Sequence, residues 1–335
     1  MVKTLRTAVV GLGWAGSVHA RTLAALPGVA LVALADPDPA RLAAFPGLPT
    51  VTSVRDLLRM RLDYCVVATP TAAHEECALA LAAAGVPALI EKPLAPSAEA
   101  AWRISDAFEQ AGTLAAVGHS ERHHAPLTEL ARRLHAGEFG DLWQLATRRQ
   151  GPYSGRVRDV GVAFDLLVHD VDLASWLARQ PVETVTAAAC VIAGPHEDTA
   201  TATSYLRGGI LAHHHADWIT PFKHRTLQAH TATGVLTADT VAGTLTHHTN
   251  AATTISSGLF PGVVAGDARA IVLPERAAPF TLEHQLMRDA LLGGDAGGLV
   301  TLGEGAAAVA ATEALLTAAR TGATVHVLSR QPALT

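Results

Sequence analysis

Hydrophobic residues in the first third of the chain form short continuous runs, which are separated by longer amphipathic stretches. The runs predict strands at residues 7–10, 30–35, 64–68, 88–90 and 114–117. The stretches between them predict helices at residues 14–26, from about 39, and at 56–61, 73–84 and 97–110. Strands that alternate with helices at this spacing are typical of βαβ units. Because the runs are apolar throughout, we expect a parallel sheet that helices cover on both faces.

The pattern changes after about residue 120. Helices are predicted at residues 126–135 and 160–177, and an apolar closing helix at 303–320. Between them, threonine- and valine-rich segments alternate polar and apolar positions, at residues 185–192, 200–206, 210–217, 226–230 and 244–248. This alternation indicates an open, mostly antiparallel sheet. The predicted fold class is α/β, with a first domain over residues 1–121 and a second over residues 122–335.

The composition narrows the kind of protein. Hydrophobic residues make up 49% of the 335 positions and charged residues 16%, which is typical of a globular chain. The net charge of −5, without a basic stripe, argues against nucleic acid or acidic membranes as partners. No apolar run approaches the ~18 residues of a membrane span. Cys65, Cys77 and Cys190 have no metal-like spacing, so we expect reduced thiols in a cytoplasmic protein.

A glycine-rich segment, Gly11 to Gly16, follows the first predicted strand and opens the first helix with Trp14 and Ala15. Gly11 permits a tight turn, Gly13 lets backbone amides approach a pyrophosphate, and Gly16 lets helix and strand pack closely. A glycine turn without a ligand is the alternative. The position between strand and helix favours a dinucleotide-binding Rossmann domain.

An acidic residue stands where such a domain binds ribose. Asp36 ends the second predicted strand, twenty positions after Gly16, where a carboxylate accepts hydrogen bonds from ribose hydroxyls. A carboxylate there repels a 2′-phosphate, so NAD is predicted rather than NADP. The nearby Arg41 keeps NADP open as the second option.

Two further strand ends carry polar groups. Thr69-Pro70 ends the third strand before His74 opens the next helix, and Glu91-Lys92-Pro93 ends the fourth. Open α/β sheets bind ligands at the carboxyl ends of their strands. Lys92 is one of only three lysines, with Lys3 and Lys223, and a cis peptide before Pro93 is an option that would aim its side chain. Ordinary strand-to-loop exits are the alternative.

The helix predicted at residues 160–177 combines acidic and imidazole groups. Asp165 and His169 are one turn apart on the same face, and Asp172 follows three positions later. In a cleft, an acid at this spacing orients the ring or the substrate while the imidazole moves a proton. The alternative is a surface pair at i,i+4. The apolar residues around the pair indicate a largely buried helix instead.

With these segments in order and at this spacing, the sequence resembles the Gfo/Idh/MocA family over essentially its whole length. The resemblance implies a Rossmann domain and an α/β domain on a large open sheet, through which members often oligomerise. It also implies that Lys92 sits between nicotinamide and substrate. Asp165 and His169 would be the substrate-side pair, with His169 as acid and base. The second domain would then bind substrate and form a homodimer or homotetramer.

Three segments resemble the UDP-N-acetylglucosamine 3-dehydrogenase-like members in particular: residues 117–122, residues 160–162 with 167–172, and residues 217–221 with Lys223 and Arg225. Those members oxidise a sugar 3-hydroxyl. The chain departs from their Phe-Asn-Pro with His123-His124-Ala125. Expected cofactor contacts are Gly11, Gly13, Trp14, Ala15, Gly16, Asp36, Arg41, Thr69, Pro70, His74, Glu91, Lys92 and Pro93. Expected substrate contacts are Lys92, His119, Arg148, Tyr153, Asp165 and His169.

Two other groupings have open interpretations. His213 and His215 share a strand face, but two imidazoles do not make a metal site, so no metal is predicted. Four arginines lie close together in the sequence: Arg148, Arg149, Arg156 and Arg158. They are suited to clamping a nucleotide diphosphate, and equally to a solvated basic loop.

The predicted function is NAD-dependent oxidation of a secondary hydroxyl, expected at C3, of a sugar-like small molecule such as a nucleotide sugar or an aminoglycoside-type glycoside. Lys92 would stabilise the developing alkoxide. Same-fold alternatives are an NAD(P)H-dependent ketosugar reductase, an inositol dehydrogenase and a redox-neutral enzyme that keeps NAD bound. A non-catalytic NAD-binding sensor is the alternative of another class, although it has no need of Lys92, Asp165 and His169.

Overall fold

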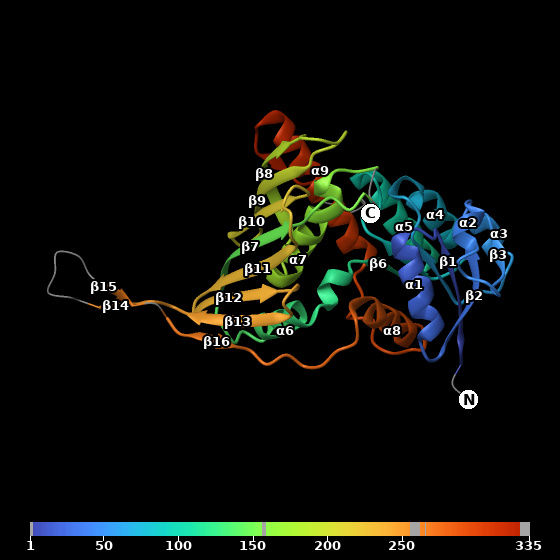
Figure 1. The fold of residues 1–335 in the computed structure, drawn as a ribbon, viewed down its shortest axis with the longest axis horizontal. Coiled ribbons are helices and arrows are strands. Elements are labelled where there is room, and N and C mark those ends of the chain that lie inside the picture. The colour runs from blue at the N-terminus through green and yellow to red at the C-terminus, as the bar shows by residue number, and fades with distance from the viewer. Residues whose placement is uncertain (1–2, 156–158, 255–261, 265, 329–335) are drawn as a thin grey trace.

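The computed structural model describes the whole chain except residues 1–2, 156–158, 255–261, 265 and 329–335. Its strands form two main sheets that lie side by side (Figure 1). The first carries helices on both faces, and the second carries helices on one face only. Within the described residues, no helix combines the length and the apolar composition needed to cross a bilayer.

The first sheet is parallel and has the strand order β3-β2-β1-β4-β5-β6. Its strands are β1 (Leu5–Val10), β2 (Val29–Ala35), β3 (Thr50–Val51), β4 (Tyr64–Val67), β5 (Ala88–Glu91) and β6 (Ala115–Gly118). Its helices are α1 (Trp14–Ala25), α2 (Pro39–Leu42), α3 (Val54–Leu57), η1 (Thr71–Ala73), α4 (His74–Ala83) and α5 (Ala98–Ala111). This strand order is that of a Rossmann sheet, so the Rossmann fold predicted for the first domain is confirmed.

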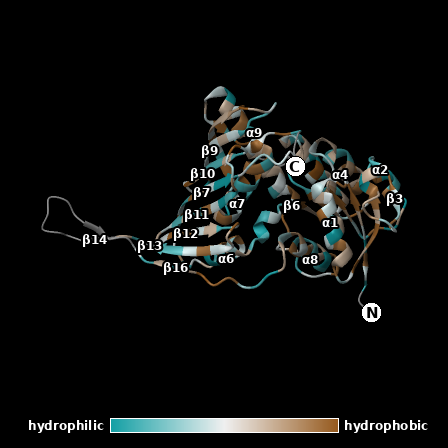
Figure 2. Ribbon diagram, viewed as in Figure 1, coloured by the Kyte–Doolittle hydropathy of each residue, from teal (hydrophilic) through white to brown (hydrophobic). Residues whose placement is uncertain are grey.

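The elements begin and end where the sequence provides caps. The Ser97 side chain accepts a hydrogen bond from the Ala100 backbone at the start of α5, and Gly112 ends that helix at a φ of 59°. Strands β1, β4 and β5 are almost entirely buried because helices cover both faces of the sheet. In Figure 2 the strands of the second sheet mix hydrophobic and hydrophilic positions.

The second sheet has nine strands within the described residues, in the order β16-β13-β12-β11-β7-β10-β9-β8-β17. They are β7 (Leu142–Gln150), β8 (Val182–Cys190), β9 (Thr199–Leu206), β10 (Ile210–Asp217), β11 (His224–Thr231), β12 (Gly234–Asp239), β13 (Thr244–Thr249), β16 (Ala268–Ala270) and β17 (Val325–His326). All neighbouring strands are antiparallel except β7 and β10. The prediction of a large, mostly antiparallel sheet is confirmed. A separate pair, β14 (Ala252–Thr254) and β15 (Gly262–Val264), projects from its edge (Figure 1).

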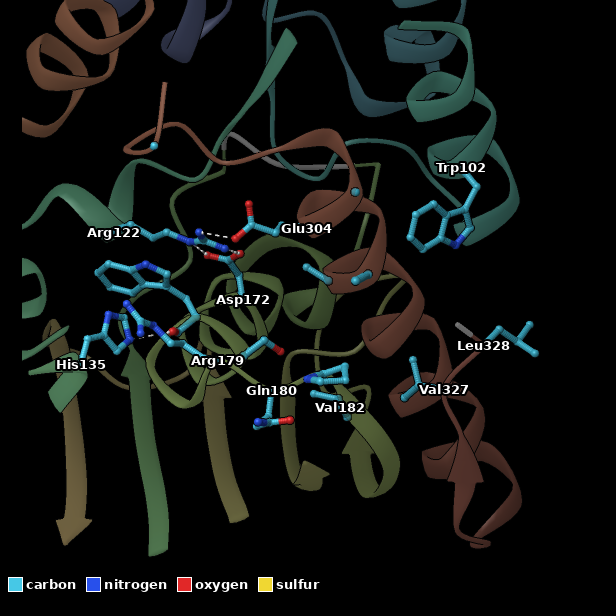
Figure 3. Close-up of a pocket in the computed structure, with 17 residues that line it drawn as sticks. Trp102, Arg122, His135, Asp172, Arg179, Gln180, Val182, Glu304, Val327 and Leu328 are labelled. Carbon is cyan, nitrogen blue, oxygen red and sulfur yellow. Dashed lines mark hydrogen bonds and ion pairs between the residues drawn. The ribbon is translucent and has the colours of Figure 1, made fainter. Parts of the chain in front are cut away.

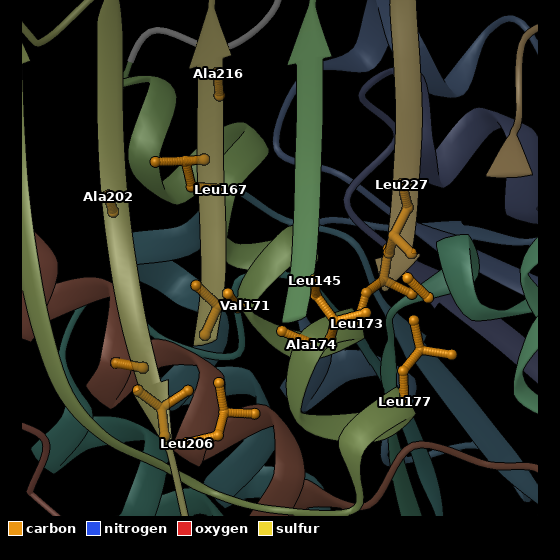
Figure 4. Packing of buried hydrophobic residues seen from close by; sticks show 14 of the residues in the cluster. Leu145, Leu167, Val171, Leu173, Ala174, Leu177, Ala202, Leu206, Ala216 and Leu227 are labelled. Carbon is orange, nitrogen blue, oxygen red and sulfur yellow. The ribbon is translucent and has the colours of Figure 1, made fainter. Parts of the chain in front are cut away.

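Helices cover one face of the second sheet. The helices after the first domain are η2 (Ser120–His123), α6 (Ala125–His135), η3 (Ala163–Leu167), α7 (Val168–Ala178), α8 (Pro279–Leu291) and α9 (Leu302–Thr321). Of these, α6, η3, α7 and α9 pack on this sheet. Figure 4 shows Leu167, Val171 and Leu173 of the η3–α7 segment packed against Leu145 and Leu227 of the strands. This core fixes the direction in which the polar side chains of η3 and α7 point.

The helix predicted at residues 160–177 differs at its start. It begins at Ala163 with the π-helical turn η3 and continues as α7. At the other end of the chain, α8 packs on α1, and the first turns of α9 join the core of the parallel sheet through Leu302 and Ala306. We propose the domain boundary between residues 121 and 122, with α8 and the start of α9 returning to the first domain.

Candidate active site

A cavity of about 530 Å³ lies between the carboxyl edge of the parallel sheet and the start of the η3–α7 segment. We call it the cleft. It is lined by Gly11, Gly13, Trp14, Ala15, Arg41, Ala68, Thr69, Pro70, Thr71, Glu91, Lys92, Pro93, Gly118, Ser120, Glu121, His124, Asp159, Val160, Asp165, Leu166, His169, Arg225, Pro279 and Phe280. The structure therefore brings together most of the predicted cofactor residues and all three predicted catalytic residues.

The glycine segment forms the cofactor end of the cleft. Gly11 has a φ of +86°, and a Cβ there would lie 2.5 Å from the carbonyl oxygen of Ala68. A Cβ on Gly16 would collide with the backbone of Gly11, so helix α1 packs against the turn only because Gly16 is a glycine. A Cβ on Gly13 would meet no atom within 4 Å, so the space above the α1 N-terminus is open. These features fit a dinucleotide pyrophosphate.

Asp36 is held by backbone amides at the glycine turn, and the ribose-binding role predicted for it stays a prediction. Its Oδ2 atom accepts the backbone N–H of Leu12 at 2.6 Å, and its Oδ1 atom accepts that of Asp38 at 2.9 Å. Only 1% of the residue is exposed, because these amides hold the carboxylate beneath the glycine turn. Arg41 lines the cleft instead, with Nη1 3.5 Å from Asp36 Oδ2.

His74 lies beneath the cleft rather than in its lining. Its Nε2 atom lies 2.9 Å from the carbonyl oxygen of Thr69, and its Nδ1 atom lies 3.0 Å from that of Pro93. Burial lowers the pKa of His74, although these carbonyl contacts raise it in part. The ring thus ties together the two strand ends, at Thr69-Pro70 and at Lys92-Pro93. The Lys92–Pro93 peptide is cis.

Lys92 and Asp165 meet across the two domains. The Lys92 Nζ atom donates to Asp165 Oδ1 at 3.0 Å and to the Asp165 carbonyl oxygen at 2.7 Å. Asp165 lies in the π-helical turn, and His169 follows it in the first turn of α7. All three side chains line the cleft next to Glu91. The expected grouping of a lysine, a carboxylate and an imidazole is therefore present.

His169 is set up as an uncharged imidazole. Burial lowers its pKa well below 6.5, and the positive charges of Lys92 and Arg149 lower it further. Its Nδ1 atom is enclosed and finds no hydrogen-bond partner among the described residues. The Nε2 atom is therefore the one available to a ligand in the cleft. His119, predicted to contact substrate, lies behind this ring instead, with the two ring centroids 5.7 Å apart.

Asp172 does not share the face of Asp165 and His169. Arg122 donates from Nε to Asp172 Oδ2 at 2.8 Å and from Nη1 to Glu304 at 2.8 Å. These three groups line a second cavity of about 670 Å³ (Figure 3). The π-helical turn lies between Asp165 and the α7 residue Asp172, so a regular helical projection gives the wrong angle between these two acids.

Two predicted substrate residues lie outside the cleft. Arg148 is exposed on the helix-free face of the second sheet, because side chains alternate along β7 and its neighbour Arg149 takes the inward position. Tyr153 is 51% exposed, and its ring lies 5.1 Å from that of Trp218. Arg156 and Arg158 lie outside the described residues.

Sequence reasoning missed six polar residues of the cleft lining: Thr71, Ser120, Glu121, His124, Asp159 and Arg225. Arg225 donates to Oε1 of Glu121 at 2.9 Å, and Arg149 forms an ion pair with the same oxygen at 3.0 Å. One sequence signal was the departure at His123-His124, the second of which lines the cleft. Strand parity supplies the other signal, since Arg225 lies two positions before the buried Leu227 and faces the same way.

The two histidines of one strand face that the sequence brought up lie on the second sheet. His213 and His215 lie on the helix-free face of β10, where His213 contacts the Thr203 hydroxyl at 3.0 Å and His215 contacts Asp217 at 3.1 Å. In the part of the chain that the structure describes, no group of three or more His, Cys, Asp or Glu side chains is arranged to hold a metal ion.

Comparison with known proteins places both halves of this site in one family. The model described as "Oxidoreductase family, NAD-binding Rossmann fold" matches residues 5–119. The GFO/IDH/MocA C-terminal domain matches residues 127–237. Together the two models span about two thirds of the chain.

Curated relatives match over part of their length. Inositol 2-dehydrogenase 4 of Saccharopolyspora erythraea is 34% identical over 193 residues, 55% of this chain and 57% of that protein. UDP-N-acetylglucosamine 3-dehydrogenase of Acidithiobacillus ferrooxidans is 31% identical over 215 residues, 62% of this chain and 65% of that protein. The chain thus spans less than two thirds of the length of these relatives.

Solved structures match over nearly the whole chain. The structure of the Acidithiobacillus ferrooxidans UDP-N-acetylglucosamine 3-dehydrogenase has a TM-score of 0.81 at 26% identity, and the match covers 94% of this chain and 97% of that one. GenD2 from gentamicin A biosynthesis, solved in complex with NAD, has a TM-score of 0.82 at 26% identity and 98% coverage of each chain.

Proposed function

Because the chain belongs to the Gfo/Idh/MocA oxidoreductase family and its first domain is an NAD-binding Rossmann fold, we propose that it oxidises a secondary hydroxyl of a sugar-like polyol with NAD. The observation that carries this proposal is the contact between Lys92 Nζ and Asp165 Oδ1, beside the uncharged His169 in the same cleft as the glycine turn. The substrate, the direction and the residue roles below are parts of the proposal.

His169 is the base in this proposal. A pKa held well below 6.5 leaves the imidazole neutral at pH 7, so Nε2 can accept the proton of the substrate hydroxyl. NAD, when bound at the glycine turn, accepts the hydride from the same carbon. The substrate thus loses one hydride and one proton and becomes a ketone.

Lys92 stabilises the oxygen that becomes negative as the proton leaves. Its ammonium group is fixed by Asp165, which accepts from Nζ through both the side chain and the carbonyl group. A donor already held in place needs no reorganisation when the charge develops. Asp165 is accordingly assigned as the residue that positions Lys92, and it is close enough to the cleft to accept from a second substrate hydroxyl.

The carbon that reacts is part of the proposal. The relative named as a 3-dehydrogenase supports oxidation at C3 if the substrate is a sugar. The relatives named as inositol 2-dehydrogenases support a carbinol of an inositol ring as the second candidate. The NAD complex of GenD2 supports an amino-sugar substrate. The same arrangement of Lys92 and His169 serves all three, because each substrate offers a ring CH–OH group.

We further propose a homodimer or homotetramer formed through the helix-free face of the second sheet. That face carries exposed side chains on neighbouring strands, among them Tyr205, which is 45% exposed, and His213. Light scattering after size exclusion would give the mass in solution, and a monomer would contradict the proposal.

The free thiols of Cys65, Cys77 and Cys190 support a reducing, cytoplasmic location.

The test of function is absorbance at the NADH band. Purified protein is mixed with NAD⁺ and a panel of inositols, amino sugars, aminoglycosides and UDP-sugars. NADH is expected with one of these substrates, and the His169→Ala variant should lose most of that activity while it still binds NAD⁺. Binding of NAD⁺ without NADH from any substrate, or NADH formation unchanged in the variant, would contradict the proposal.

A further inference from the structure

His119 lies close to both the candidate base His169 and the carboxylate of Asp172. It directly follows β6, while the other two residues belong to α7. The rings of His119 and His169 meet edge to face, with their centroids 5.7 Å apart and their planes at 84°. The His119 Nδ1 atom lies 3.8 Å from Asp172 Oδ2. The imidazole of His119 thus stands between a carboxylate at the second cavity and the ring that faces the cleft.

Asp172 is an ionised carboxylate, so it accepts hydrogen bonds and donates none. Burial by itself raises its pKa, but His119 and Arg122 outweigh burial and hold the pKa below 3.8. Arg122 donates from Nε to Asp172 Oδ2 at 2.8 Å and from Nη1 to Glu304 (Figure 3). A His119 N–H bond that points at this carboxylate is attracted to it, whereas the lone pair of a bare nitrogen is repelled. Asp172 therefore favours the form of His119 that is protonated on Nδ1.

The His119 ring then has its Nε2 atom as an acceptor. Burial lowers the pKa of His119, and the charge of Asp172 raises it only in part, so the ring is neutral at pH 7. A neutral imidazole has one donor nitrogen and one acceptor nitrogen. His119 is fully buried, and neither ring nitrogen has a hydrogen-bond partner among the described residues. A buried acceptor such as Nε2 is costly unless a donor reaches it.

The Nδ1 atom of His169 is in a similar position, since it is enclosed and has no partner in the described part of the chain. One bound water between the two rings satisfies both, as buried waters do for polar groups that the protein leaves unpaired. This water donates to His119 Nε2. If it also donated to His169, its own oxygen would be buried without a donor, so the favoured arrangement is donation from His169 Nδ1 to the water.

We infer that His119 is a positioning residue through which Asp172, by way of one bound water, holds the His169 proton on Nδ1 and leaves Nε2 free to accept. This inference deepens the proposed function, because the role of Nε2 as the base rests on that function. With the proton on Nε2 instead, the ring would present an N–H group to the substrate and could not take its proton. His119 acts through His169, and it is not among the residues that line the cleft.

The protonated nitrogen can be identified without a substrate. Two-bond ¹H–¹⁵N spectra of the intact protein, labelled at the histidine ring nitrogens, distinguish a protonated nitrogen from a bare one at pH 7.5. The variants His169→Ala and His119→Phe identify the two sets of signals by their loss. We expect both rings to be protonated on Nδ1. A His169 ring protonated on Nε2 overturns the inference, whether or not the variants of His119 fold.

A high-resolution crystal structure tests the connection between the rings. We expect a water within about 3.2 Å of both His169 Nδ1 and His119 Nε2. A site with no such water overturns the inference.

His119→Phe separates the positioning role from a structural one. Phenylalanine fills the space but neither accepts nor donates, so His169 should become protonated on Nε2 in a large fraction of the molecules. With NAD⁺ and the compound that gives NADH, kcat should fall at least tenfold, while KM and NAD⁺ affinity change by less than threefold. His214→Phe makes the same substitution at another buried histidine and is the matched control.

The outcomes of these measurements distinguish the inference from the proposed function. An unchanged His169 spectrum in His119→Phe contradicts the inference, and so does an equal fall of kcat in His214→Phe. Either result leaves the dehydrogenase function standing. No NADH from any compound contradicts the proposed function, and the spectra of the parent protein then still decide how His169 is protonated.

Discussion

The Nδ1 atom of His19 lies 2.9 Å from the Nε2 atom of His284, although 265 positions separate the two residues in the chain. Both imidazoles are fully buried. His19 Nε2 contacts Glu91 Oε1 at 2.8 Å, and His284 Nδ1 contacts the Tyr64 hydroxyl at 3.4 Å. The ionised Glu91 can only accept, so each ring donates from Nε2 and accepts at Nδ1. This run of hydrogen bonds ties α8 to the strand end that carries Lys92.

Replacing His284 with alanine should destabilise the protein by about 2–4 kcal/mol, because it leaves His19 Nδ1 buried without a donor and opens a cavity. Thermal unfolding of His284→Ala measures this. In a double-mutant cycle with His19→Ala, the two effects should be coupled by about 1 kcal/mol or more. Additive effects would contradict the hydrogen bond, and the exposed His248→Ala provides the control.

Lys92→Met should lower kcat by at least 100-fold and change the Kd for NAD⁺ by less than threefold. Methionine fills similar space but cannot donate to the developing alkoxide or pair with Asp165. Stopped-flow NADH formation and calorimetric titration of NAD⁺ give the two values. Lys3→Met, at an exposed position far from the cleft, is the control. An equal loss of NAD⁺ affinity and turnover would assign Lys92 to cofactor binding instead.

In the pH profile of kcat/KM, the loss of activity on the acid side should have its midpoint well below pH 6.5. His169 acts as a base only when it is neutral, and burial lowers its pKa well below that value. Between pH 6 and 7, kcat/KM should therefore change by less than twofold from this group. Initial rates over pH 4.5–8 measure this midpoint. A midpoint near 6.5 would mean that the ring is solvated in the working enzyme.

Thermal stability should fall as the pH drops below about 6.5. Burial lowers the pKa of His119, His214 and His284 in the folded protein, to about 3 for His214. Below the unfolded value of about 6.5, the unfolded chain then binds more protons, so the free energy of unfolding decreases. Calorimetry should show Tm lower by about 5 °C or more at pH 5.5 than at pH 7.5. His214→Gln should reduce this difference, and a flat Tm would contradict it.

Glu283→Gln should raise stability at neutral pH. Both carboxyl oxygens of Glu283 are buried without a hydrogen-bond partner among the described residues, and burial raises the pKa well above 4.5, with a further rise from the charge of Glu91. The folded form therefore disfavours ionisation, and the stability associated with the protonated acid is lost as the pH rises. The Tm of Glu283→Gln should exceed that of the parent more at pH 8 than at pH 5. The reverse order would indicate an ionised Glu283.

Local patterns predicted the features that depend on short stretches of sequence. The Gly11–Gly16 turn, the strand end at Lys92 and the cleft position of Asp165 and His169 all follow from spacing within one element. Arg148 was misplaced because two adjacent arginines lie on one strand, and only the packing of the sheet decides which of them faces inward. The hydrogen bond from the Leu12 amide to the Asp36 carboxylate also depends on how the turn folds, and the sequence pattern does not reveal it.

Contacts between distant segments were not predictable in this way. Glu121 meets Arg225 across 104 positions, and His19 meets His284 through a helix that returns from the end of the chain. Sequence spacing carries no information about such pairs, because each depends on how the two sheets are placed. Buried polar contacts of this kind are therefore visible only in the folded structure.

The π-helical turn at Ala163–Leu167 determines how the Asp165 side chain is oriented relative to His169. A π turn corresponds to one residue more than an α-helix would use. Removing that residue would let the helix run evenly into α7 and rotate Asp165 by about 100° relative to His169, since each α-helical residue turns the chain by that amount. Lys92 would lose its partner while the hydrophobic face of α7 stayed in place. The extra residue of the π turn thus sets the angle at which Asp165 meets Lys92 of the first domain.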